Sequence, residues 1–160
     1  MQYELNVDGM TELSEMLSQL EEAAPGVAAM GLYDGAGAMA DEISRAADSI
    51  KTAPFRYARG GHRRLPSPEE KEIVQAASAG IAKFDKNGTE VNTSVGFRNA
   101  GYAKLKGKTK PIPQIVNAII SGTSFMSKQP FIRQASAKGR GKAMAAIKAT
   151  IEEAFDKIIK

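Results

Sequence analysis

The residues best suited to chemistry lie in one stretch, residues 52–66, which reads TAPFRYARGGHRRLP. It holds the only histidine of the chain, His62, and no acid. A single histidine without cysteine or a neighbouring carboxylate does not make a usual zinc site. The arginines are mixed with Phe55 and Tyr57, as cations and aromatic rings are in single-strand nucleic-acid binders. We therefore predict a functional loop that contacts a partner rather than a catalytic centre, through these residues: Arg56, Arg59, Arg63 and Arg64.

Other reactive groups lack the spacing that chemistry needs. Gly35-x-Gly37 is not followed by the rest of a dinucleotide-binding fingerprint and lies inside a helical pattern. Asp41 and Glu42 are adjacent, so a helix would point them about 100° apart, which does not suit a catalytic dyad. Three further acids are explained by a helix N-terminus: Glu69, Glu70 and Glu72. The sequence predicts no catalytic residue, no cofactor site and no metal site, and hence a protein that is not an enzyme.

Charge is divided sharply along the chain. Residues 1–50 carry ten acids and one basic residue, a net charge of −9, whereas the other 110 residues carry 21 basic and 8 acidic groups, or +13. Such a chain can pair its halves internally, or stack the acidic face of one subunit on the basic face of the next. Direct DNA contact by the basic half is the open alternative. A second candidate contact set lies in the predicted loop 98–113: Lys104, Lys106, Lys108 and Lys110.

Length and composition favour one soluble domain over residues 1–160. The hydrophobic share of 42% and charged share of 25% are ordinary for a globular protein. No apolar run approaches the roughly 20 residues that cross a bilayer, and the first residues do not resemble a signal peptide. Cysteine is absent, which suits a reducing cytoplasm.

In the first half of the chain, periodicity predicts mostly helices. Residues 2–7 alternate as a short strand does, and a helix follows over about 10–23. Pro25-Gly26 should break it, and a second helix should run over about 27–51. The glycines inside that second helix favour a close helix–helix or subunit contact. A third helix over 67–80 begins with Ser67 as N-cap and Pro68 at the first helical position.

The second half contains the strand signals. Residues 81–97 predict a hairpin around Asn87-Gly88, with Ile81, Phe84, Val91, Val95 and Phe97 facing the core. Residues 114–120 should form a short helix and 121–130 an irregular segment. A final helix over 130–160 should be interrupted near 138–141, with an apolar stripe of Met144, Ile147, Ile151, Phe155 and Ile158. The predicted fold is α+β, a small antiparallel sheet with a central hairpin packed against long helices.

Three stretches carry a further pattern. They read Asp8-Gly9-Met10-x-Glu12-Leu13, then Gly31-Leu32-x-x-Gly35-Ala36-x-x-Met39-Ala40-Asp41-Glu42 ahead of Ala53-Pro54, and finally Gly122-Thr123-Ser124-Phe125-Met126-x-x-Gln129-Pro130-Phe131-Ile132-Arg133. In this order they resemble the HK-ninety-seven gene-product-ten-like tail-component family of long-tailed phages and prophages. The family's commoner "T-G-x-L" segment after Ala-Pro is replaced here by the arginine loop and the helix predicted over 67–80.

The resemblance implies a minor structural protein of the virion, assembled in the bacterial cytoplasm, for tail completion or head–tail joining. Its expected partners are copies of itself in a hexameric ring and neighbouring head-completion or tail-tube proteins, with no membrane. A basic nucleic-acid-binding protein is the alternative, and an enzyme is disfavoured because no reactive cluster is present. The signature residues are Gly122, Thr123, Ser124, Gln129, Pro130, Phe131 and Arg133. Their types predict a structural clasp: a turn at Gly122, a helix start at Pro130, a core anchor at Phe131 and a partner elsewhere for Arg133.

Overall fold

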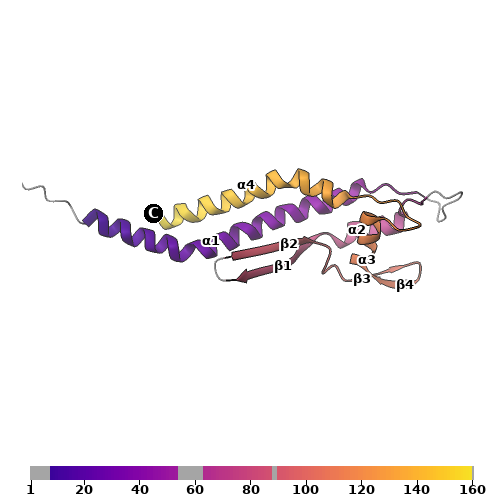
Figure 1. The fold of residues 1–160 in the computed structure, drawn as a ribbon, viewed down its shortest axis with the longest axis horizontal. Coiled ribbons are helices and arrows are strands. Elements are labelled where there is room, and N and C mark those ends of the chain that lie inside the picture. Colours follow the sequence, from indigo (N-terminus) through magenta and orange to yellow (C-terminus); the bar gives the residue numbers. More distant parts are fainter. Residues whose placement is uncertain (1–7, 54–62, 88–89, 160) are drawn as a thin grey trace, which may run out of the picture.

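The computed structural model describes residues 8–53, 63–87 and 90–159 of the chain. Two long antiparallel helices, α1 and α4, form an elongated body, a hairpin lies along α1, and three small elements crowd one end (Figure 1). In chain order the elements are α1 (Asp8–Ala46), a 3-10 turn η1 (Ala47–Ser49), α2 (Pro68–Ala77), β1 (Gly80–Asn87), β2 (Glu90–Gly96), β3 (Tyr102–Leu105), β4 (Lys108–Pro111), α3 (Ile112–Ser121) and α4 (Phe131–Ile159). The α+β class is confirmed. The strands form two separate two-stranded antiparallel sheets rather than one sheet.

Glycine allows α1 and α4 to approach closely. A Cβ built on Gly35 would lie 2.5 Å from Cγ1 of Ile147, and one on Gly139 would lie 3.0 Å from Sδ of Met39. Gly31 likewise faces Ile147 and Ile151. The predicted close helix–helix contact is therefore confirmed at Gly31 and Gly35, whereas Gly37 has open space where a side chain would stand.

Charge also joins the two helices. Glu42 of α1 receives hydrogen bonds from Lys142 of α4 and from Arg45. The hydrogen bond from Lys142 is the main cause of a lowered pKa for the Glu42 carboxyl. Nearer the far end, Thr150 donates a 2.6 Å hydrogen bond to Asp34. Part of the charge asymmetry is thus balanced inside the chain, as one of the two alternatives predicted.

Two predicted helix breaks are wrong. Pro25 lies inside α1, which Figure 1 shows bent but unbroken. Proline removes the hydrogen bond to the carbonyl of residue 21. Because Glu21 is exposed, water can satisfy that carbonyl. The interruption expected at 138–141 is also absent, because buried Gly139 packs on Met39 and Glu42 and this contact offsets the low helix propensity of glycine.

The hairpin of β1 and β2 is confirmed, with a shifted connection. Asn87 pairs with Glu90, so the two connecting positions are 88 and 89, which lie outside the described residues. Ile81 pairs with Val95 and both are half-buried, while Phe97 is buried, so these three agree with the predicted core face. The side chains of Phe84 and Val91 lie outside the described residues. The predicted N-terminal strand over 2–7 also lies outside the described residues.

The loop predicted over 98–113 is wrong. Residues 102–111 form the β3–β4 hairpin, and its two connecting residues, Lys106 and Gly107, both have positive φ, at 52° and 75°. Two positive values in succession define a type I′ turn, which suits the twist of paired strands. The single glycine and the run of lysines obscured this turn in the sequence.

Most of the core lies at the end where the small elements gather. The side chains of Val74, Ile119 and Ala47 are fully shielded, and the rings of Phe97 and Phe131 meet edge to face at 6.3 Å. Phe131 therefore anchors the start of α4, as predicted. The apolar stripe predicted for the last helix is partly wrong, since Met144 is exposed and Ala143 is buried in its place. None of the helices within the described ranges is long and apolar enough to cross a membrane.

The contact between α1 and α4, called here the helical seam, can be tested with a matched pair of substitutions in α1. Gly35→Ala should destabilise the fold by about 1–2 kcal/mol, because overpacking outweighs the helix-propensity gain. Gly37→Ala should stabilise it by about 0.5–1 kcal/mol, since its Cβ meets nothing within 4 Å. Urea unfolding of both variants measures the two free energies. Equal effects of the same sign would show that the seam does not require glycine at position 35.

Candidate functional site

The signature stretch forms a clasp, defined here as residues 122–130, between α3 and α4. Gly122 has φ +73°, and a Cβ there would lie 2.9 Å from the Lys128 nitrogen, so both conformation and space demand glycine. The hydroxyl of Thr123 accepts hydrogen bonds from the backbone N–H groups of Phe125 and Met126, at 3.2 and 3.0 Å. These contacts close a tight turn and direct Met126 into the core, where it is 3% exposed.

Gln129 ties the clasp to the chain that leaves α1. Its amide donates a 2.8 Å hydrogen bond to the Lys51 carbonyl and accepts one of 2.8 Å from the Lys51 N–H. Its own backbone N–H donates to the Ile119 carbonyl at 2.7 Å. One side chain thereby satisfies both backbone groups of a residue 78 positions away, which fixes the start of α4 against the end of α1.

The clasp also binds the end of the predicted arginine loop. Arg64 pairs with Met126 as an isolated parallel bridge, with Arg64 N–H donating to the Phe125 carbonyl at 2.8 Å and Ser127 N–H donating to the Arg64 carbonyl at 2.9 Å. The two candidate sets taken separately from the sequence therefore meet in space. Of the loop, Arg56, Arg59 and His62 lie outside the described residues.

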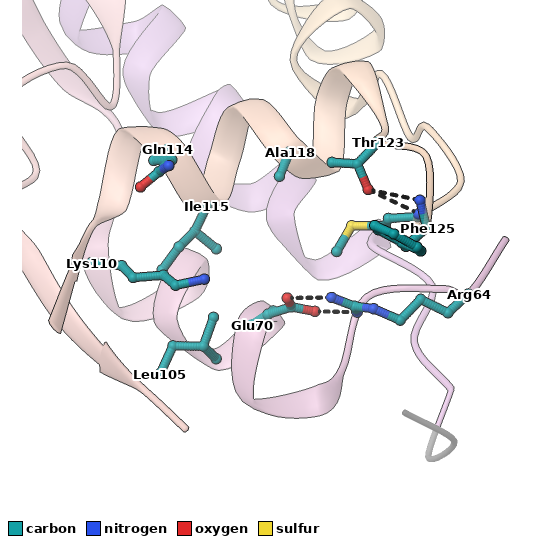
Figure 2. A pocket seen from close by; sticks show the side chains of 10 residues that line it. Arg64, Glu70, Leu105, Lys110, Gln114, Ile115, Ala118, Thr123 and Phe125 are labelled. Atoms are coloured by element: carbon teal, nitrogen blue, oxygen red, sulfur yellow. Dashed lines mark hydrogen bonds and ion pairs between the residues drawn. The ribbon is translucent and has the colours of Figure 1, made fainter. Parts of the chain in front are cut away.

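The side chain of Arg64 is engaged within the fold. Its guanidinium donates two hydrogen bonds, of 2.7 and 2.8 Å, to the two carboxylate oxygens of Glu70 (Figure 2). Glu70 also accepts the Ser67 N–H while the Ser67 hydroxyl accepts the Glu70 N–H, so the capping box of α2 is complete. We accordingly reassign Arg64 from partner contact to holding α2 against the clasp, and Glu70 from a plain helix-dipole acid to its buried partner.

Burial opposes the charge of Glu70, which is only 5% exposed. Hydrogen bonds from Arg64 and Ser67 and the attraction of the guanidinium outweigh that burial, so the pKa of Glu70 lies below its ordinary value of 4.5. The hydrogen bond to Glu70 in turn raises the pKa of Arg64. Both groups are therefore ionised at neutral pH and serve the fold rather than proton transfer.

The four predicted lysines lie on one hairpin but do not form one surface. We call the β3–β4 hairpin with its turn the lysine ribbon. Residues paired across an antiparallel ladder share a face. The pairs Ala103 with Lys110 and Leu105 with Lys108 place two lysines on the inner, core-side face. Lys104 shares the outer face with Tyr102, which is 74% exposed, and Lys106 sits in the turn.

A pocket of about 630 Å³ lies between the lysine ribbon, α3, α2 and the clasp (Figure 2). We call it the ribbon pocket. Its lining is mainly apolar, with the Arg64–Glu70 pair on one side, Lys110 reaching in from the ribbon and Phe125 exposed at the rim. Its lining residues are Arg64, Glu70, Leu105, Lys110, Gln114, Ile115, Ala118, Thr123, Phe125 and Met126.

The remaining candidate residues lie apart from this pocket. Arg63 is exposed, and its carbonyl accepts a hydrogen bond from the Ser127 hydroxyl. Ser124 is exposed on the clasp. Arg133 is exposed in the first turn of α4, and no described residue forms an ion pair with it, so a partner elsewhere for Arg133 stays a prediction. Within the described ranges, no group of three metal-ligating side chains is brought together.

Sequence reasoning missed the apolar part of the pocket. Phe125 lies in the signature stretch but is not among the predicted signature residues, and Gln114 enters the sequence prediction only as the start of a short helix. The signal in the sequence was the amphipathic pattern of α3, whose Ile115 and Ile119 are buried while Gln114 and Asn117 are exposed.

A scan against models of protein families, a search of curated proteins and a search of solved structures each found no match.

The Arg64–Glu70 pair leads to a prediction about the free energy of unfolding and its dependence on pH. Glu70→Gln should destabilise the fold at neutral pH by about 2–4 kcal/mol, because it leaves a partly buried guanidinium without its counter-ion. Since the folded pKa of Glu70 is lowered, its contribution is complete above 4.5 and is lost as pH falls through the folded pKa. The difference between wild type and variant, measured by urea unfolding, should shrink in acid.

Glu72→Gln is the matched control, because Glu72 is exposed on the same helix. It should change the free energy of unfolding by less than about 0.5 kcal/mol. If the difference in the free energy of unfolding between wild type and Glu70→Gln stays constant between about pH 7 and pH 3, this would contradict the role given to this carboxylate.

Proposed function

We propose that this chain is a minor structural protein of a tailed phage or prophage, acting in tail completion or head–tail joining as a subunit of an oligomeric ring. The resemblance of the signature stretch first suggests this function. What supports it in the fold is that Gly122, Thr123, Gln129 and Phe131 are all used to hold elements together. A signature made of structural contacts suits a protein whose role is assembly.

The observation that carries the proposal is the polarity of charge along the body. Residues 8–34, toward the free end of α1, contain six acids and no basic residue. Residues 98–128, at the end formed by the small elements, contain six basic residues and no acid (Figure 1). Complementary ends on one subunit favour head-to-tail association, which closes into a ring when the rotation between subunits allows it.

Removing the chain from the phage or prophage that encodes it tests this function. We expect infectious particles to be lost and unjoined heads and tails to accumulate under the electron microscope, with complementation restoring whole particles. Protein quantification in purified particles should find the chain at the copy number of a ring, with a hexamer as the expectation. Normal infectivity and complete tails without the chain would contradict the proposal.

A nucleic-acid-binding role is the second candidate, favoured by the outer face of the lysine ribbon. Tyr102 and Lys104 are exposed there, and a two-stranded ribbon fits the major groove of DNA. If this face binds DNA, affinity should fall steeply with salt, by a log–log slope of about −0.9 for each phosphate neutralised. Lys104→Glu should weaken that binding, which a filter or anisotropy assay measures. Affinity unaffected by salt and by Lys104→Glu would exclude this role.

A further inference from the structure

Helix α1 extends past the end of α4. Gly35 faces Ile147 and Gly31 faces Ile151, so a step of four along α1 matches a step of four back along α4. The same register places the last residue of α4, Ile159, opposite Ala23. Residues 8–22 therefore project beyond α4 by about 22 Å, at 1.5 Å per residue. Figure 1 shows this end of α1 also reaching past strands β1 and β2.

The projecting end is acidic and partly apolar. Leu17 is 57% exposed, with Met16 and Leu20 half-buried beside it at helical spacing. Glu15, Glu21 and Glu22 are exposed, and no basic residue occurs between positions 8 and 44. A helix with an exposed apolar stripe and one sign of charge has the character of a segment that binds in a groove.

The ribbon pocket offers the complementary surface. Its apolar lining comes from α3, the lysine ribbon and the clasp, and Lys110 reaches into it. Glu70 is the only acid in the lining, and its oxygens are already bound to Arg64 and Ser67. No described carboxylate pairs with Lys110. The pocket therefore presents apolar surface and uncompensated positive charge to a binding partner.

The two surfaces lie at opposite ends of the elongated fold, so one chain in this conformation cannot join them (Figure 1). We infer that residues 15–22 of α1 dock in the ribbon pocket of a second copy of this chain, with Leu17 and its apolar neighbours inside and the glutamates toward Lys110. This contact is heterologous, so it propagates from copy to copy and closes into a ring where the rotation between neighbours allows it. The inference rests on the proposed function in one respect, that copies of the chain assemble with one another.

The absence of cysteine allows a clean cross-linking test. Leu17→Cys and Gln114→Cys proteins, the second enlarged by a tag, are mixed and treated with a short bis-maleimide. Gln114 is exposed and lines the pocket, so the mixed dimer should form several-fold faster than in the control mixture of Met144→Cys with Gln114→Cys. Met144 is 59% exposed on α4 and Leu17 is 57% exposed, so cysteines introduced at the two positions should be similarly accessible. A doubly substituted chain should give a ladder of products that ends at a closed ring.

Charge substitutions provide the second readout. Lys110→Glu should lower the cross-linking rate of the Leu17–Gln114 pair several-fold, whereas Lys104→Glu, on the outer face of the same ribbon, should leave it unchanged. Circular dichroism of each variant serves as the control that the variant is folded. Equal rates for the Leu17 and Met144 mixtures, or a Leu17–Leu17 product that forms faster, would overturn the docking.

The outcomes separate this inference from the proposed function. If the chain is required for complete particles, but Leu17 and Gln114 are not cross-linked preferentially in solution or in those particles, then the docking fails and the function stands. If the preferred cross-link forms, but particles assemble normally without the chain, then the docking stands and the function fails.

Discussion

The backbones of α1 and α4 approach closely where three glycines lie between the two helices. Gly31 and Gly35 of α1 leave room for Ile147 of α4, and Gly139 of α4 leaves room for Met39 and Glu42 of α1. Packing of this density tolerates little added volume. It fixes the register between the helices, and the register in turn determines how far α1 projects and where α4 begins relative to the end of α1.

At the other end of the body, three polar devices hold the small elements in place. Gln129 joins the clasp to Lys51, Thr123 closes the clasp turn, and Arg64 joins α2 to the clasp through Glu70. Each satisfies backbone or charged groups that would be costly to bury alone. Beneath them the Phe97–Phe131 contact anchors α4. The lysine ribbon and the ribbon pocket are therefore positioned by specific polar and apolar contacts, which suits a surface that must fit a repeated neighbour.

The sequence predicted the features that local physics controls. Ser67 and Pro68 define the start of α2 because capping is satisfied within one turn, and the hairpin over 80–96 follows from alternation around a turn. Gly122 and Phe131 have the structural roles expected from their types. The failed predictions have different causes. Gly139 lies inside a long helix because it packs directly against α1, a tertiary contact that offsets its low helix propensity. Pro25 lies inside α1 where Glu21 is exposed, so water can replace the hydrogen bond that proline removes.

The candidate site shows the same division. The sequence alone determines that the first third of the chain is acidic and the remainder basic, and that the chain contains a single histidine. It also shows that arginines and lysines are concentrated in two stretches. Only the tertiary structure decided which of those cations are engaged inside the fold and which face outward. Arg64 is bound to a buried acid six residues away, and the lysines of one stretch divide between two faces of a ribbon. Net charge is a property of the chain, whereas the partner of each charge depends on which segments the packing of the helices brings together.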